Sequence, residues 1–68
     1  DQGMLQCPLE AVDLANGTIT MLNMRIRITA QTVFSKGGPG SIDQLTVGSV
    51  LQVSFQNTGN GPVASHIS

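Results

Sequence analysis

Turn-forming residues interrupt this chain at short intervals, and the segments between them alternate apolar and polar residues. Gly, Asn and Pro recur between the apolar segments along the whole length of 68 residues. No window places apolar residues at helical spacing for more than two turns, whereas period-two alternation with frequent turns is the pattern of β-strands. The chain is therefore expected to fold as an all-β domain.

The clearest alternation runs from Met24 to Thr29. One face of this segment is apolar and the other is basic or polar, which indicates a half-buried strand whose charges lie in water. The inward set is Met24, Ile26 and Ile28, and the outward set is Arg25, Arg27 and Thr29.

Four further strands complete the expected set. Proline cannot donate a hydrogen bond to a strand ladder, so Pro8 should lie on an edge strand or at a bulge. In the fourth strand, residues Leu51, Val53 and Phe55 are expected to face the core. The four strands are expected at Met4–Leu14, Thr18–Leu22, Ser49–Gln56 and Pro62–Ile67.

Three connections have distinct patterns. Gln31–Ser35 is expected to add a short extended piece with Val33 or Phe34 turned inward. Ser41 and Gln44 match a helix capping box, which predicts a single helical turn over Ser41–Leu45. Lys36–Gly40 is too rich in Gly and Pro for any regular element.

The first hairpin is expected at Asn16-Gly17, since both residue types tolerate a positive φ. A two-residue turn there would place Leu14 opposite Ile19 and Val12 opposite Met21. These four apolar residues would then share one face.

Five short strands, with a helical turn before the fourth, favour a sheet that curls into a small barrel, because this removes most edges and encloses one core. A single domain over residues 1–68 is the only count that fits this length, with residues 1–3 as a flexible start.

Charge is scarce, with a net charge of −1 and three basic residues. Such a chain offers no electrostatic footprint for nucleic acid or an anionic membrane. No apolar run approaches the roughly 20 residues that span a bilayer. No signal peptide is expected within the chain, because its start has neither a basic region nor an apolar stretch.

The sequence contains no expected catalytic, cofactor-binding or metal-binding residues. Cys7, the single cysteine, excludes an intrachain disulfide and is expected to be a small buried apolar residue, with an attachment point as the alternative. His66, the single histidine, is expected to face solvent, and one Cys with one His cannot build a closed metal site. The acidic residues lack calcium-loop spacing. An enzyme is therefore not expected.

Two short motifs are better explained by turns. Lys36 precedes the glycines of its loop and Pro39 removes one N–H, whereas a phosphate loop needs Lys after the glycines. Asn16-Gly17-Thr18 matches a glycosylation sequon, but the hairpin turn accounts for it.

The order and spacing of these elements resemble a bacterial family, domain of unknown function 5666. Asn23 departs from the family pattern, since it stands where Gly is frequent, but Asn also reaches left-handed backbone geometry. Phe55 departs as well, because it stands where a small residue is common, and it would enlarge the core or mark a surface patch. The resemblance implies an envelope or extracellular setting, a barrel related in shape to oligonucleotide-binding (OB) folds, and no assigned activity. The matching segments are Val12-Asp13, Gly17–Met21, Thr32–Phe34, Ile42–Leu45, Val47–Val53 and Val63–Ile67.

The leading expectation for function is a non-catalytic structural or interaction module of an exported bacterial protein. Its partners would be itself or sister domains of a longer chain, and its contact surface would include Arg25, Arg27 and Val50, with an edge strand near Pro8. The alternative is an OB-like barrel that binds an oligosaccharide or single-stranded nucleic acid on its sheet face. Nucleic acid is disfavoured, because stacking aromatics and a basic groove are missing.

Overall fold

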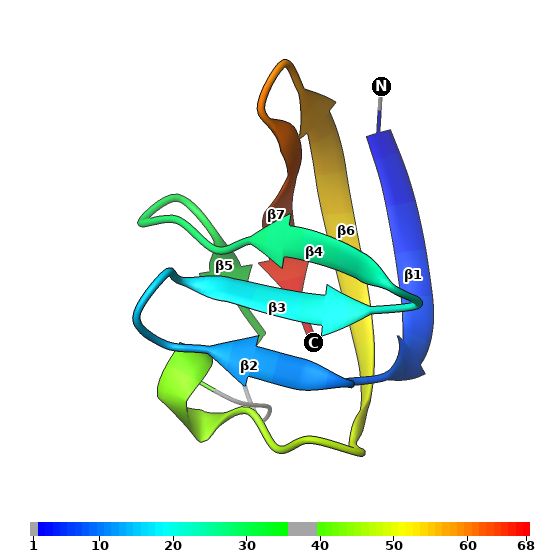
Figure 1. The fold of residues 1–68 in the computed structure, drawn as a ribbon, viewed down its shortest axis with the longest axis vertical. Coiled ribbons are helices and arrows are strands. Elements are labelled where there is room, and N and C mark those ends of the chain that lie inside the picture. The colour runs from blue at the N-terminus through cyan, green and yellow to red at the C-terminus, as the bar shows by residue number, and fades with distance from the viewer. Residues whose placement is uncertain (1, 36–39) are drawn as a thin grey trace.

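The computed structural model of the protein describes residues 2–35 and 40–68. These residues form one curled β-sheet with a short 3₁₀ turn beside it (Figure 1). Asp1 and residues 36–39, which include most of the expected Gly- and Pro-rich loop, lie outside the described residues. The elements are β1 (Gln2–Pro8), β2 (Ala11–Asp13), β3 (Thr18–Met21), β4 (Met24–Arg27), β5 (Val33–Phe34), η1 (Ile42–Gln44), β6 (Val50–Thr58) and β7 (Gly61–Ile67).

The sheet is barrel-like, which confirms the predicted fold class. Its strand order is β1-β6-β7-β4-β3-β2, and β5 lies beside β7. β7 runs parallel to β4 and β5, whereas the other neighbours are antiparallel. Among the described residues no ladder joins β1 to β2, so the sheet is not closed by hydrogen bonds all the way round.

The predicted first strand is divided at Leu9 and Glu10, which makes two strands where one was expected. The N–H of Leu9 donates to Ser49 O at 2.8 Å, while the N–H of Glu10 donates to Thr20 O at 2.9 Å. Consecutive residues thus bond to opposite ends of the sheet, and the bent chain itself spans the gap. As predicted, Pro8 lies on an edge strand, where it is the last residue of β1. Gln2 and Gly3, expected as part of a flexible start, are the first residues of that strand.

The predicted register of the β2–β3 hairpin is wrong by two residues. Val12 lies opposite Ile19 instead of Met21, and Leu14 lies in a four-residue turn, 59% exposed. Asp13 accounts for the longer turn, because its carboxylate accepts hydrogen bonds from the backbone N–H and side-chain amide of Asn16, at 3.2 and 2.7 Å. Such Asx contacts favour turns.

The core confirms most of the predicted inward residues. Leu51, Val53 and Phe55 are all buried, and the 8% exposure of Phe55 places it in the core. Of the two candidates in β5, Phe34 packs against the core, whereas Val33 is 56% exposed. The buried residues are Leu9, Ile19, Met21, Ile26, Leu51, Val53, Phe55, Ala64 and Ile67.

The expected helical turn is present as the 3₁₀ helix η1, but its capping differs from the predicted box. Ser41 makes no side-chain cap bond to the backbone, and its hydroxyl donates to the Asp43 carboxylate instead. Gln44 does reach back, but its Oε1 accepts the N–H of Gly40 at 2.7 Å.

Within the two described ranges, no helix has the length and apolar character that crossing a membrane would require.

Candidate interaction surface

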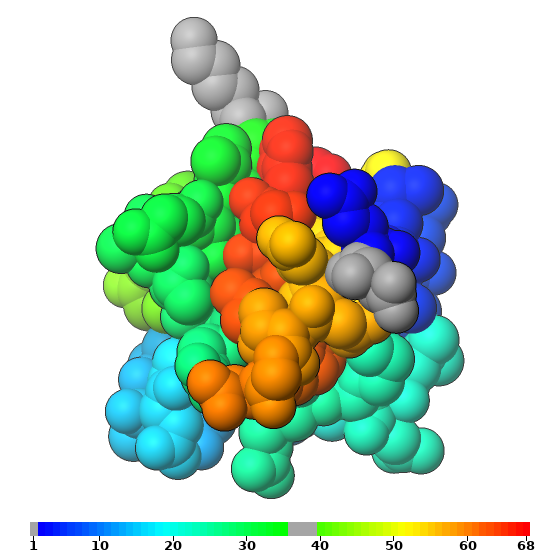
Figure 2. Space-filling model, turned by 90° about the horizontal axis from the view of Figure 1, so that it is seen from above, coloured from blue at the N-terminus to red at the C-terminus, as the bar shows by residue number. Residues whose placement is uncertain are grey.

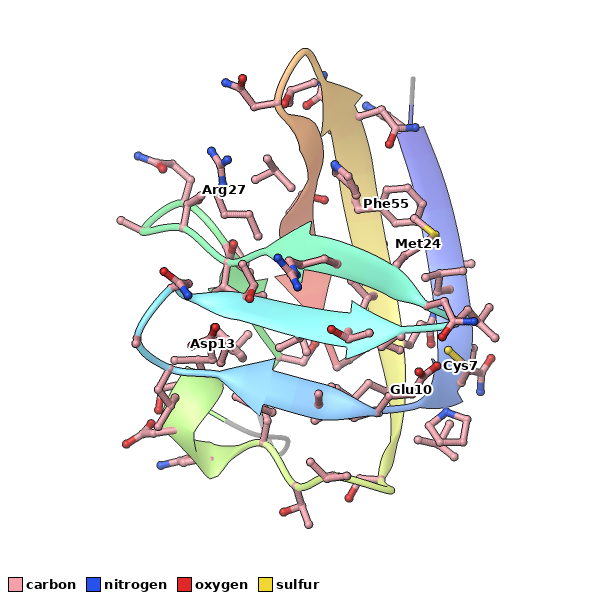
Figure 3. All side chains as sticks on the ribbon, viewed as in Figure 1. Cys7, Glu10, Asp13, Met24, Arg27 and Phe55 are labelled. Carbon is pink, nitrogen blue, oxygen red and sulfur yellow. The ribbon has the colours of Figure 1, made fainter. Side chains whose placement is uncertain are left out.

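The outer surface of the sheet divides into a charged half and a neutral half. The charged face is formed by the outward residues of β2, β3 and β4, which make two cross-strand rows. Asp13 and Arg27 stand on this face in Figure 3. The rows are Ala11–Thr20–Arg25 and Asp13–Thr18–Arg27.

Hydrogen bonds lower the pKa of Asp13 on the charged face. The side-chain amide of Asn16 has the largest effect, followed by the Asn16 backbone N–H, and the charge of Arg25 acts in the same direction. Donors to a carboxylate stabilise its ionised form, which moves the pKa below its ordinary value. The ionised carboxylate of Asp13 thus stabilises the hairpin turn through its hydrogen bonds with Asn16.

The neutral face is formed by outward residues of β1, β6, β7 and β5. Its central row crosses four strands as Met4–Ser54–His66–Val33, because these residues pair in register. The apolar members are well exposed: Met4 is 62%, Val50 61% and Val33 56% exposed. The face comprises Met4, Gln6, Pro8, Val33, Val50, Gln52, Ser54 and His66, none of which is Asp, Glu, Lys or Arg.

Polar contacts order the side chains of the neutral face. The Gln52 amide donates to Met4 Sδ at 3.1 Å across β1 and β6. Ser35 Oγ and His66 Nε2 lie 2.7 Å apart and link the β5 segment to β7. These contacts hold the outward side chains in defined positions without a formal charge.

A β-bulge shapes the upper part of this surface. The β6–β7 register shifts between Ser54 and Phe55, which leaves Ser65 unpaired, and its hydroxyl donates to Ser54 O at 3.1 Å. Two open hollows of about 420 and 200 Å³ meet here and share Gln56 and Ser65. The first is lined by Gln2, Gly3, Met4, Ser54, Phe55, Gln56 and Ser65, and the second by Thr29, Gln31, Gln56, Thr58, Val63, Ala64 and Ser65.

One border of the neutral face is the open edge of β1. In the described part of the chain β1 pairs with β6 alone, and the view in Figure 2 has the start of β1 (blue) at the margin of the molecule. Strand residues direct their backbone groups alternately to either side. Gln52 exchanges both of its backbone hydrogen bonds with Ser68, on the β7 side. Its neighbours in β6 therefore face β1, and Gln2, Met4 and Gln6 direct their N–H and C=O groups to the open edge.

The structure separates the three residues predicted for the contact surface. Arg25 and Arg27 are exposed on β4, in the charged face, as their outward alternation predicted. Val50 is exposed on β6, and β7 lies between these two strands. Sequence reasoning predicted an edge strand near Pro8 but missed Met4 and the row that it forms with residues of β6, β7 and β5. The alternation of Met4, Gln6 and Pro8 was a usable signal, but only the pairing with β6 shows which face it forms.

The residues considered for chemistry lie apart. Cys7 is half-buried against the core, and His66 is exposed on the neutral face. Within the described residues no three His, Cys, Asp or Glu side chains gather where they could hold a metal ion.

A family model described as "domain of unknown function (DUF5666)" matches residues 8–68. The chain belongs to this family. A search of curated proteins gives no match for the DUF5666 domain.

Solved structures share the fold of the DUF5666 domain. The fimbrial biogenesis protein PilY2 from Pseudomonas aeruginosa PAO1 superposes with a TM-score of 0.80 at 16% identity, over 100% of this chain and 86% of the other. CusF from Escherichia coli in its apo form gives 0.76 at 20% identity, over 100% and 86%. CusF with Ag(I) gives 0.75 at 21% identity, over 100% and 90%. At these identities the likeness establishes the fold alone.

Proposed function

We propose that this DUF5666 domain is a non-catalytic interaction module of an exported bacterial protein, and that its neutral face binds sister copies of the domain. The observation that carries the proposal is the separation of charge between the two outer faces. Covering a charged group removes it from water at a cost of several kcal/mol unless it is paired, and interface centres are depleted in charge. A face with exposed Met and Val and ordered amides avoids that cost.

The surroundings of His66 support the non-catalytic part of the proposal. A Ser–His pair becomes a nucleophile and base when a third group orients the imidazole and donors stabilise the oxyanion. The contact between Ser35 and His66 is exposed, and no orienting carboxylate is bonded to the ring among the described residues. A hydrolytic activity that is lost in His66→Ala would overturn this part.

A metal-carrying function, suggested by the Ag(I) structure of CusF, does not fit the described residues. Soft ions such as Ag(I) and Cu(I) select thiolate and thioether ligands. Here Met21 is fully buried in the core, and Met4 is outward on β1 with its sulfur bonded by Gln52. Met24 packs against the core from β4, and Cys7 does so from β1. The sulfur atoms thus serve separate parts of the fold.

An envelope setting is supported by two similarities. The fimbrial biogenesis protein PilY2 shares the fold, and fimbriae are surface structures. The low charge of the chain, with solubility supplied by Ser, Thr, Asn and Gln, is common in secreted β proteins.

The test is the molar mass of the protein by light scattering over a wide concentration range, with Met4→Lys and Ala11→Lys as a matched pair. Both residues are exposed on strands, but Met4 is on the neutral face and Ala11 on the charged face. We expect association that is lost in Met4→Lys and retained in Ala11→Lys. A strict monomer at every concentration, or equal loss in both variants, would overturn the proposal.

Oligosaccharide binding is a second candidate, favoured by the two hollows that meet at Gln56 and Ser65. Amide and hydroxyl groups are the donors and acceptors that sugar hydroxyls require. NMR titration with a set of neutral oligosaccharides tests this candidate. Shifts confined to the hollows, weakened by Gln56→Ala and unaffected by Gln52→Ala, would support it, and a flat titration would exclude those sugars.

A further inference from the structure

The backbone N–H and C=O groups on one side of β1 bond to β6, whereas those on its other side face no strand among the described residues. The N–H of Glu10, at the end of the bend, donates to Thr20 O of β3. By strand alternation the backbone groups of Gln6, Met4 and Gln2 point to the same side. There β3 has ended at its hairpin with β4, and the described residues place no strand beside β1.

This edge lacks the features that usually protect an exposed strand. Natural proteins place charged residues, prolines or bulges on such edges to prevent pairing with another chain. The segment from Gln2 to Gln6 carries no charge and no proline, and its ladder with β6 is regular throughout. Pro8 blocks only the far end.

We infer that two copies of the domain pair through this edge, antiparallel about a two-fold axis at Met4, so that β1 of each copy extends the sheet of the other. This inference rests on the proposed function and names its contact. A two-fold interface brings the same patch from both subunits together, so it must be self-complementary. An uncharged row of alternating N–H and C=O groups meets that condition, and strand addition is an established mode of recognition.

The position of Pro8 selects the register. With the axis at Met4, that residue faces its own copy, and Gln2 faces Gln6 of the second chain. All N–H groups on the open edge then find a carbonyl. An axis at Leu5 would instead place Gln2 opposite Pro8, whose ring carbon takes the place of the N–H, so each Gln2 carbonyl would face a proline ring and find no donor.

The side chains fit the same register. The two Met4 side chains, each 62% exposed in one copy, come together at the centre of the joint neutral face. Each Gln2 then lies beside Gln6 of the other chain, where the two amides can pair. No like charges meet, because none of these residues is charged.

A disulfide cross-link tests this register directly. The 68-residue chain carries Met4→Cys in a Cys7→Ser background, and the control carries Gln52→Cys in the same background. Cα atoms of a hydrogen-bonded antiparallel pair lie about 5.5 Å apart, within the roughly 4.4–6.8 Å that a disulfide bridges. Gln52 is equally outward but one strand further in on each copy and opposite Gln6, so its two Cα atoms would be separated by three strand spacings across the sheet and four residues along it, about 20 Å.

We expect mild oxidation to give roughly tenfold more covalent dimer with Met4→Cys than with Gln52→Cys, since only the first pair meets the geometry of a disulfide. Equal yields would overturn the edge pairing. They would leave the proposed function standing if light scattering still shows association sensitive to Met4→Lys.

Gln6→Pro provides a second measurement that does not depend on cysteine chemistry. The N–H of Gln6 points to the open edge, so its loss spares the ladder with β6, and proline is tolerated at such edge positions. We expect a monomer that keeps the thermal stability of the parent chain. Met4→Lys, which places two positive charges at the axis, should give the same result if Gln6→Pro fails to fold. Association unchanged in a folded variant would overturn the inference.

Discussion

At Leu22 the backbone has φ = 52°, a left-handed conformation that is uncommon for a residue with a branched side chain. With Asn23 at φ = 61°, it forms the two-residue turn between β3 and β4, a type that prefers Asn and Gly at both positions. Asn23 fits this requirement, as the sequence predicted. Leu22 does not fit it. Because its side chain is 58% exposed, burial compensates little for the unfavourable backbone conformation.

The first prediction is that Leu22→Asn stabilises the domain by about 0.5–1 kcal/mol, since Asn tolerates the left-handed region better than Leu. Leu14→Asn is the control, because Leu14 is equally exposed in a turn but has no positive φ. Urea unfolding of both variants measures the effect. The idea fails if the two substitutions change stability by the same amount.

Asp13 gives the second residue-scale prediction, which concerns pH. Its pKa is lowered in the folded state, so its stabilising contribution is complete above the ordinary carboxyl pKa and disappears as the pH falls through the lower folded value. Asp13→Asn should therefore be less stable than the parent near pH 6, and the two should converge as the pH falls through the folded pKa of Asp13, where the parent carboxyl also becomes neutral. Thermal unfolding across this range provides the measurement, and a difference independent of pH would contradict it.

At the scale of elements, β4 and β5 act as one interrupted strand beside β7, and Thr32 bridges the interruption. Its hydroxyl donates to Ala64 O at 2.6 Å and accepts the N–H of Thr29 at 3.0 Å. A side chain thus supplies the hydrogen bonds that a continuous ladder would have made.

The third prediction is that Thr32→Val destabilises the domain by about 1–3 kcal/mol, because the isosteric change leaves a partly buried donor and acceptor without partners. Thr20→Val is the control, since Thr20 lies on β3 and its side chain makes no hydrogen bond to any of the described residues. Chemical denaturation should show a clear loss for the first variant only.

The packing of β1 on β6 depends on a glycine. A Cβ added at Gly3 would lie 2.5 Å from Cζ of Phe55, whose ring is labelled in Figure 3. Phe55 is 8% exposed, so its ring has little freedom to move away.

The fourth prediction is that Gly3→Ala costs about 1–3 kcal/mol through overpacking, and that Phe55→Leu in the same chain recovers part of this loss. Gly59→Ala serves as the control, since nothing lies within 4 Å of its added Cβ. A double-mutant cycle by thermal unfolding measures the coupling. Additive effects would show that the ring accommodates the methyl group.

At the scale of the whole molecule, the barrel is completed by a bend in the chain instead of a closed ladder. Leu9 stands at that bend and is 1% exposed. Its side chain joins the core contributed by β3, β4, β6 and β7, so the bend is held by packing as well as by the hydrogen bonds of its backbone.

The fifth prediction is that Leu9→Ala costs about 2–5 kcal/mol. That loss approaches the whole stability expected of a domain this small. Leu14→Ala, at a leucine that is 59% exposed, should stay within about 0.5 kcal/mol of the parent. Circular dichroism at rising temperature distinguishes a destabilised fold from an intact one. A small effect at Leu9 would mean that the backbone hydrogen bonds alone hold the bend.

The sequence by itself determined the local features of this protein. Alternation predicted the strands and the inward residues of β4 and β6, because the side-chain period of a strand is a property of the backbone. The short helical turn and the left-handed Asn23 followed from local conformational preferences. The outward direction of Arg25, Arg27 and Val50 was predictable for the same reason.

Only the tertiary structure decided which segments lie beside one another. The bend at Leu9 and the bridge made by Thr32 depend on partners that are distant in the chain. The hairpin register set by Asp13 depends on a choice between turns of similar free energy. The neutral face emerges only when β1 pairs with β6, and the same pairing shows that the edge predicted at Pro8 extends back to Gln2. Their residues are unremarkable in the sequence, since an exposed Met or Gln becomes part of a surface only through the neighbours that the fold places next to it.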